Sequence, residues 1–157
     1  MSTAAVTRDI VINASPETVY DVVSQPEHMS KWFSDDADFE PVAGTTGVLS
    51  WRDKATNQTS TIKVTVVTAD RPNVFSFHWV SPERQREMPT ATDPVLVEFR
   101  ITPEANGTRL VVSESLDTVE WDDDAKAAYA ADHNNGWGSF LPRLRDYAEG
   151  LVGEDSA

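Results

Sequence analysis

The stretch NNGWGSFLPRLRDYAEGL, residues 134–151, has the pattern of a long amphipathic helix near the end of the chain. Its large apolar residues recur at the spacing of one helix face: Trp137, Phe140, Leu141, Leu144 and Leu151. The same stretch contains Gly136, Gly138 and Pro142, three residues of the types that weaken helices. A helix with one apolar face needs an apolar surface to cover, so the rest of the sequence must supply a partner.

The partner predicted from the middle of the chain is an antiparallel β-sheet. Apolar and polar residues alternate along several segments, as they do in strands with one buried and one wet face. Asn106 and Gly107 form a strong hairpin-turn signal. The polar segment Ser81–Pro94 is expected to be a solvated loop rather than a lid over a site. The predicted strands are Val6–Asn13, Gly47–Arg52, Ser60–Val67, Asn73–Val80, Val95–Ile101 and Thr108–Ser115, with a weaker candidate at Phe39–Val42.

Two short helices are predicted between the first strand and the rest of the sheet. Ser15 suits a helix N-cap and Pro16 suits the first helical position. Pro26 ends the first helix and allows a second one to begin. The second helix ends in the aromatic pair Trp32 and Phe33. The predicted order is therefore strand, two short helices, several antiparallel strands and a long final helix, which is an α+β arrangement.

Length and composition are those of a globular domain. The chain has 157 residues, of which 39% are hydrophobic, enough for one packed core. We therefore expect a single domain over residues 1–157, with an ordered core from about 6 to 151. The sequence contains no cysteine, which excludes disulfides, thiolate catalysis and cysteine-ligated zinc.

The charge of the chain is strongly negative. It carries 26 acidic and 13 basic residues, a net charge of −13. Such a field repels phosphate backbones and anionic membranes, so neither nucleic-acid binding nor membrane insertion is expected. The beginning, MSTAAVTRDIVI, lacks the basic and apolar segments of a signal peptide, and a cytoplasmic location is expected.

Three segments of the sequence resemble a known family when they are taken in order. They are DIVINASPETVYDVVSQPEHMSKWF (residues 9–33), VEFRITPEANGTRLVVSES (97–115) and HNNGWGSFLPRLRDYAEGL (133–151). This order resembles the helix-grip fold of the START-like superfamily, which includes the birch-pollen allergen. Within it, the chain is similar to the family related to activators of the heat-shock protein 90 ATPase. The resemblance implies a curved antiparallel sheet wrapped around a long C-terminal helix, with a cavity between them that binds apolar molecules in many members.

The implied fold suggests a reason for the weak helix formers near the C-terminus. Gly136 and Gly138 would remove side chains where the helix lies against the sheet or a ligand. Pro142 cannot donate to the carbonyl of Gly138 and would kink a continuous helix there. The alternative is a helix that begins later, near Ser139, with Pro142 in its first turn. The kinked continuous helix is the preferred interpretation.

The apolar faces of the predicted sheet and helix are unusually aromatic. These residues either line a cavity or fill the core, and their spacing alone does not separate the two. The candidate ligand-binding residues are Trp32, Phe33, Trp51, Phe75, Phe77, Trp79, Phe99, Trp137, Phe140 and Leu141. The predicted ligand is a hydrophobic small molecule, either lipid-like or aromatic.

Few polar residues are candidates for chemistry. Glu114 shares strand parity with Leu110 and Val112, so it could enter the cavity and is the weak catalytic candidate. Arg8 shares strand parity with Ile10, so it could pair with a buried Glu114. The preferred interpretation is that both side chains lie at strand ends and reach water.

The three histidines are isolated in the sequence, so structural or surface roles are expected for them. His78 should face solvent, and His133 should lie near the cavity mouth. The acidic run Asp122–Asp124 is interpreted as the first turn of a helix rather than a cation site. Neither a metal nor a cofactor is predicted.

Three functions remain open. A non-enzymatic binder of a hydrophobic small molecule is preferred. An enzyme of the polyketide cyclase or dehydratase kind would need an acid or base in the cavity, for which Glu114 is the candidate. A chaperone-modulating protein is implied by the family resemblance. Related eukaryotic activators work with a second domain, for which this sequence leaves no room.

Overall fold

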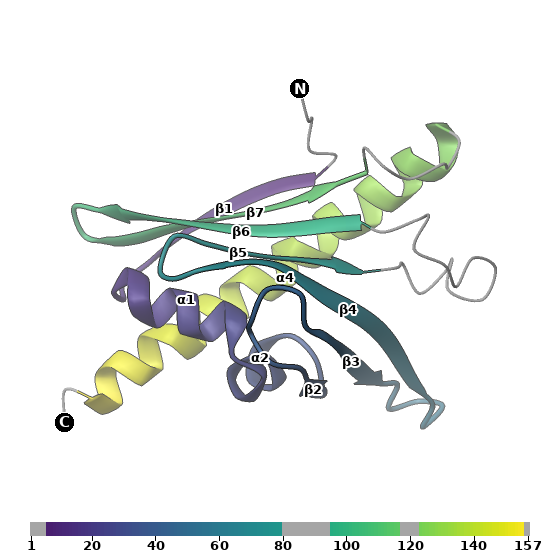
Figure 1. Ribbon diagram of the computed structural model, residues 1–157, viewed down its shortest axis with the longest axis horizontal. Coiled ribbons are helices and arrows are strands. Elements are labelled where there is room, and N and C mark those ends of the chain that lie inside the picture. Colours follow the sequence, from purple (N-terminus) through teal and green to yellow (C-terminus); the bar gives the residue numbers. More distant parts are fainter. Residues whose placement is uncertain (1–5, 80–94, 117–122, 156–157) are drawn as a thin grey trace.

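The computed structural model describes residues 6–79, 95–116 and 123–155, and it has the helix-grip architecture (Figure 1). A curved sheet of seven strands crosses the long C-terminal helix α4, Asp123–Asp155. All neighbouring strands are antiparallel, in the order β1-β7-β6-β5-β4-β3-β2. The strands are β1 Val6–Ile12, β2 Asp36–Asp38, β3 Thr46–Arg52, β4 Thr59–Asp70, β5 Val74–Trp79, β6 Val95–Glu104 and β7 Gly107–Ser115.

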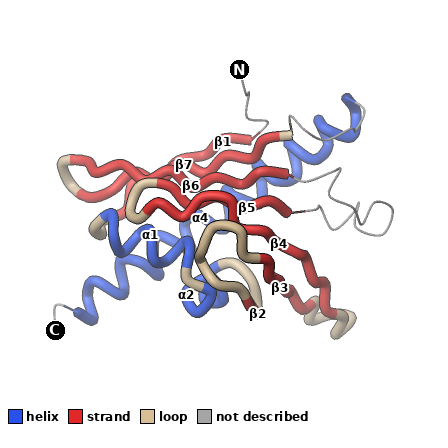
Figure 2. Tube along the Cα trace, in the orientation of Figure 1, coloured by secondary structure: helices blue, strands red, loops and turns tan. Residues whose placement is uncertain are grey.

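Two short helices follow β1, as predicted, and lie at one end of the sheet (Figure 2). Helix α1, Pro16–Ser24, is capped by Ser15, whose Oγ accepts a hydrogen bond from the Thr18 N–H at 3.2 Å. Helix α2, Pro26–Trp32, begins at the predicted breaking proline. The two helices are joined by the Trp32 indole N–H, which donates to the Val22 carbonyl at 2.9 Å.

The C-terminal helix is continuous through Pro142. The preferred interpretation is therefore right on continuity, and the alternative of a helix beginning near Ser139 is wrong. Pro142 leaves the carbonyl of Gly138 without its intrahelical donor, which a helix of this length tolerates because its apolar face is covered. That face includes Trp137, Leu141 and Leu144, all buried in the core.

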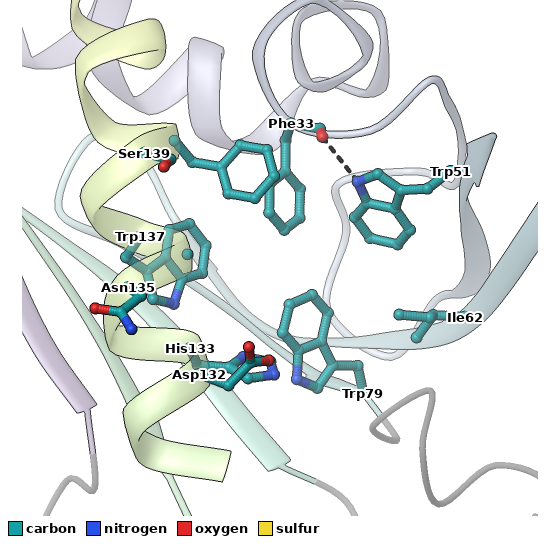
Figure 3. Close-up of a pocket in the computed structure, with 11 residues that line it drawn as sticks. Phe33, Trp51, Ile62, Trp79, Asp132, His133, Asn135, Trp137 and Ser139 are labelled. Atoms are coloured by element: carbon teal, nitrogen blue, oxygen red, sulfur yellow. Dashed lines mark hydrogen bonds between the residues drawn. The ribbon is translucent and has the colours of Figure 1, made fainter. Parts of the chain in front are cut away.

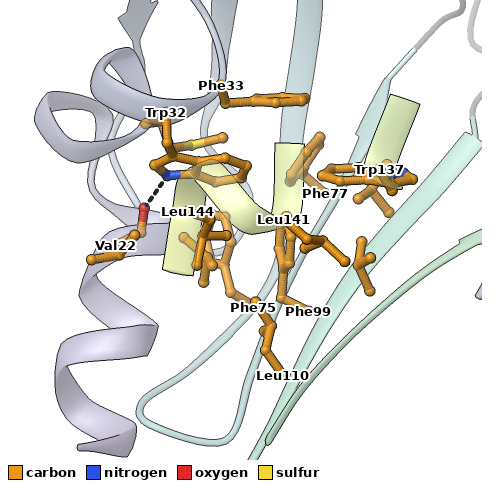
Figure 4. Close-up of a cluster of buried hydrophobic side chains, with 14 of the residues drawn as sticks. Val22, Trp32, Phe33, Phe75, Phe77, Phe99, Leu110, Trp137, Leu141 and Leu144 are labelled. Carbon is orange, nitrogen blue, oxygen red and sulfur yellow. Dashed lines mark hydrogen bonds between the residues drawn. The ribbon is translucent and has the colours of Figure 1, made fainter. Parts of the chain in front are cut away.

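The core lies between the inner face of the sheet and the helices (Figure 4). Strand residues at alternate positions supply it, as period-two patterning requires. Phe75, Phe99 and Leu110 are completely buried on β5, β6 and β7. Phe99 packs edge-to-face against Trp32, with ring centroids 6.3 Å apart, which joins the sheet to α2. This packing fixes the position of α2 relative to the sheet, and both the end of α2 and the sheet contribute to the cavity described below.

One strand prediction is wrong. The edge strand is Asp36–Asp38, not Phe39–Val42. The Phe39 side chain turns into the core instead, and Gly47 lies so close behind it that a Cβ there would collide with Phe39. Close packing therefore overrides the weak strand pattern of this segment. The polar segment predicted as a loop, 81–94, lies outside the described residues.

The hairpin between β6 and β7 forms where the turn was predicted, but its two turn residues are Ala105 and Asn106, because Glu104 pairs with Gly107. Gly107 has φ +149, and a Cβ there would collide with the backbone carbonyl of Ile12 on β1. We expect Gly107→Ala to lower the free energy of unfolding by at least about 1 kcal/mol in urea titrations. Gly44→Ala is the control, because Gly44 also has positive φ but open space around it. Equal losses in both variants would show that the collision contributes nothing.

No helix within the described ranges is long and apolar enough to cross a membrane.

Candidate functional site

A cavity of about 440 Å³ lies between α4 and the curved sheet, at the end of α2 (Figure 3). Its volume falls in the range of about 300–1,000 Å³ that is usual for small-molecule sites. Aromatic side chains make up most of its wall, and polar residues of α4 stand along one side. The lining residues are Phe33, Trp51, Ile62, Trp79, Asp132, His133, Asn135, Gly136, Trp137, Ser139 and Phe140.

Phe33 is the centre of the aromatic wall. Its ring is nearly parallel to those of Trp137 and Trp79, with centroids 5.3 Å and 5.9 Å away. Trp51 and Phe140 meet the Phe33 ring edge-on, at 5.2 Å and 5.0 Å. The Trp51 indole N–H also donates to the Phe33 carbonyl at 2.8 Å, which fixes one wall to the end of α2 (Figure 3). The wall is therefore rigid and apolar, and suits a flat apolar ligand.

Behind the polar side of the cavity lies Glu114 of β7, whose exposed fraction is 0%. Three donors from one face of α4 converge on its carboxylate. The Trp137 indole N–H donates to Oε2 at 2.7 Å, and His133 Nδ1 lies 2.9 Å from the same oxygen. The Tyr129 hydroxyl donates to Oε1. A carboxylate surrounded by three donors is satisfied without water, so this buried charge is compensated by hydrogen bonds.

The network extends from Glu114 to the cavity through His133. The His133 side chain is 16% exposed and lines the cavity, with its ring stacked on Tyr129 at a centroid distance of 3.7 Å. The Trp79 indole N–H donates to the Tyr129 hydroxyl at 3.1 Å. His133 is thus held by both Glu114 and Tyr129, and its position in the cavity wall is determined by a buried network.

The ten residues predicted to bind ligand divide into two groups of five. Five line the cavity: Phe33, Trp51, Trp79, Trp137 and Phe140. The others belong to the buried core: Trp32, Phe75, Phe77, Phe99 and Leu141. A second pocket beside Phe75 and Phe77 has no room for a water molecule, so the core there is filled. Ligand binding by the first group stays a prediction.

The two polar candidates, Glu114 and Arg8, lie in different surroundings. Glu114 faces inward but lies behind the wall instead of in the cavity, and it is buried rather than exposed at a strand end. Arg8 is exposed, as strand ends usually are, and its guanidinium lies over Gly138 of α4. The preferred expectation that both side chains reach water is therefore right for Arg8 and wrong for Glu114, whose partners are the three donors of α4.

Sequence reasoning missed Tyr129 and the polar side of the cavity formed by Asp132, Asn135 and Ser139. A signal for the network was present, because Tyr129, His133 and Trp137 are spaced i, i+4 and i+8. That spacing places all three on one helix face. It predicts a shared target for their donors, but the target, Glu114, lies on another element.

Gly136 and Gly138 of α4 have different surroundings. A Cβ at Gly138 would collide with the guanidinium of Arg8. The missing side chain therefore leaves room for the Arg8 side chain of β1 to lie over the helix. Gly136 lines the cavity, and a Cβ there would meet nothing within 4 Å. The expectation that these glycines remove side chains facing the sheet or a ligand site agrees with both positions.

The remaining histidines have structural surroundings. His28 Nδ1 lies 2.7 Å from the Tyr147 hydroxyl and joins α2 to α4. His78 points away from α4 but is half-buried rather than fully exposed to solvent, and burial lowers its pKa. Asp123 and Asp124 form the first turn of α4, while Asp122 lies outside the described residues. Among the residues placed by the structure, no group of three or more acidic or histidine side chains is arranged to hold a metal.

A family model described as "Activator of Hsp90 ATPase homolog 1-like protein" matches residues 13–149. The chain belongs to this family. The match includes all the described residues that line the cavity as well as the Glu114 network. A comparison with curated proteins gave no match.

Solved structures share the fold of this Activator of Hsp90 ATPase homolog 1-like chain. Protein MLL2253 from Mesorhizobium loti has a TM-score of 0.71 at 19% identity, covering 90% of this chain and 94% of that one. The Aha1 dimer from Colwellia psychrerythraea has a TM-score of 0.69 at 21% identity, covering 92% and 95%. DynU16, from the dynemicin biosynthetic locus, has a TM-score of 0.71 at 19% identity, covering 92% of this chain and 46% of that one. At such identities the likeness shows the fold alone.

Proposed function

We propose that this protein binds a hydrophobic small molecule in the cavity between α4 and the sheet. The observation that carries the proposal is an aromatic-walled cavity of about 440 Å³ beside a core that is filled around Phe75 and Phe77. Pre-formed apolar cavities with a few polar groups are the usual sites of small ligands. The family's START-like fold and the biosynthetic setting of DynU16 support a ligand of this kind.

The cavity offers a test that does not disturb the core. Gly136→Leu places a side chain into open space on the cavity wall. We expect at least a tenfold loss of affinity (~1.4 kcal/mol) for N-phenyl-1-naphthylamine, a neutral probe that fluoresces in apolar sites. The free energy of unfolding should not fall, because leucine favours a helix over glycine by up to about 1 kcal/mol.

Gly150→Leu is the matched control, because it makes the same change in the same helix. A Cβ at Gly150 would also meet nothing within 4 Å, and this glycine lies outside the cavity lining. The affinity of the Gly150→Leu variant for the probe should equal that of the unmodified protein. If the Gly136→Leu variant binds the probe as tightly as the unmodified protein does, the probe binds outside this cavity.

The ligand class is measured by amide NMR with a mixed library of fatty acids, phospholipids, flavonoids and polyketides. Saturable shifts at Phe33, Trp79 and Trp137 are expected with at least one compound. If neither the library nor the probe binds, the proposal is wrong. The family description would then direct attention to a chaperone partner, and the next measurement would be the ATPase rate of heat-shock protein 90.

A further inference from the structure

The hydrogen bond between His133 and Glu114 determines which ring nitrogen meets the cavity. A carboxylate can only accept, so His133 donates the Nδ1 hydrogen to Glu114 Oε2 across 2.9 Å. In the neutral ring this makes Nε2 an acceptor with a free lone pair. Within the described part of the chain, no hydrogen bond to Nε2 is found, and the side chain lines the cavity.

The charges around the ring select against anionic ligands. Asp132 lines the same side of the cavity, and the buried Glu114 lies directly behind His133. Among the described residues, the titratable groups beside the ring are Glu114 from β7 and Tyr129 from α4, which contact it, and Asp132, which lines the same cavity. The whole chain carries a net charge of −13. A fatty-acid carboxylate would therefore enter against both the local and the overall field.

The remaining walls select for flat rings. Phe33 is nearly parallel to Trp137 and Trp79, at interplanar angles of 10° and 18°. Figure 3 shows Phe33, Trp51, Trp79 and Trp137 arranged around the open space, with His133 at its lower edge. Aromatic ligands gain from such faces and edges beyond the area that they bury.

We propose that the cavity binds a neutral aromatic molecule bearing an acidic hydroxyl, of the phenol or enol type, whose O–H donates to His133 Nε2. This inference rests on the proposed function and specifies its ligand class. When the hydroxyl ionises in the site, its O–H bond breaks and an N–H bond forms at Nε2, while the electron pair stays on the ligand oxygen. The imidazolium then lies between this oxygen and Glu114, so the proton transfer needs no other reactant. Glu114 acts as a positioning residue, because it touches His133 and not the ligand.

The test compares 2-naphthol with 2-methoxynaphthalene, which has the same ring system but no hydroxyl hydrogen. We expect 2-naphthol to bind the unmodified protein about tenfold more tightly (~1.4 kcal/mol), the value of one well-placed hydrogen bond. His133→Phe should remove this preference and keep the binding of 2-methoxynaphthalene. His28→Phe is the matched control, because His28 bonds to Tyr147 and does not line the cavity.

The outcomes separate this inference from the proposed function. Equal binding of the two naphthalenes by the unmodified protein would overturn the inference and leave a hydrophobic binder. Failure of both to bind, together with failure of N-phenyl-1-naphthylamine, would reject the cavity as a site. A preference that persists in the His133→Phe variant would also overturn the inference, because the hydroxyl would then be recognised elsewhere.

The positioning role of Glu114 has a separate readout in the ¹⁵N NMR spectrum of His133. When its ring is neutral, His133 of the unmodified protein should carry its hydrogen at Nδ1, with Nε2 as the bare nitrogen. Glu114→Leu removes the acceptor and should shift the ring toward the Nε2–H form and reduce the preference for 2-naphthol, whereas Glu114→Gln keeps an acceptor oxygen and should retain the Nδ1–H form. A purely structural role would change stability but not the tautomer, so an unchanged spectrum in the Glu114→Leu variant would contradict the assignment.

Discussion

Replacing Glu114 by alanine should lower the free energy of unfolding by about 3–5 kcal/mol. The carboxylate is fully buried and accepts hydrogen bonds from Tyr129, His133 and Trp137. Its removal leaves three donors of α4 without their acceptor at a position that is fully buried. The loss is larger than that of an ordinary hydrogen bond because each unsatisfied donor retains its desolvation cost.

Urea unfolding followed by circular dichroism measures this effect, and Glu98→Ala is the matched control. Glu98 lies on the neighbouring strand β6, and its side chain is 29% exposed where it pairs with Arg100 at 3.3 Å. Partly exposed pairs of this kind contribute about 0–1 kcal/mol, so the control should change little. Comparable losses in the two variants would mean that the network on α4 contributes no more than a surface ion pair.

The second large effect is expected at Trp32. Trp32→Ala should cost about 3–5 kcal/mol of stability, because a completely buried indole is removed from the core. It also removes the hydrogen bond to the Val22 carbonyl that joins α1 to α2. The affinity of the folded fraction for the naphthylamine probe should change little, because Trp32 does not line the cavity.

Trp51→Ala is the matched comparison, since it also removes one indole and one hydrogen bond to a carbonyl. Trp51 is only half-buried and stands in the cavity wall. Its loss should cost less than half as much stability as the loss of Trp32. It should also lower the affinity for the naphthylamine probe severalfold. Thermal unfolding and fluorescence titration of both variants provide the comparison. The reverse pattern would show that the division between wall and core is wrong.

The elements of the fold could be predicted from local patterns. Ser15 and Pro16 predicted the start of the first helix, because a cap and a first-turn proline act within a few residues of one another. Alternating residues predicted the strands of the sheet, including the hairpin at Gly107. The weak strand at Phe39–Val42 was wrong because contact with Gly47, rather than local preference, places the Phe39 ring.

The site was only partly predictable. The resemblance to a family with a cavity pointed to the space between helix and sheet, where a cavity with the expected aromatic residues lies. The Glu114 network was not foreseen, because its acceptor is on β7 and its three donors are on α4. Periodicity shows which donors share a helix face, but it does not show which strand residue that face meets.

Trp32 and Phe33 illustrate what each level of structure determines. The sequence by itself determined that both are apolar aromatics at the end of a helix, because this depends on residue type and local spacing. Only the tertiary structure decided that Trp32 fills the core and Phe33 stands at the centre of the cavity wall. The physical reason is that a residue becomes core or wall according to whether distant segments close over it. For Phe33 those segments are β3, β5 and α4, which leave an open space beside its ring.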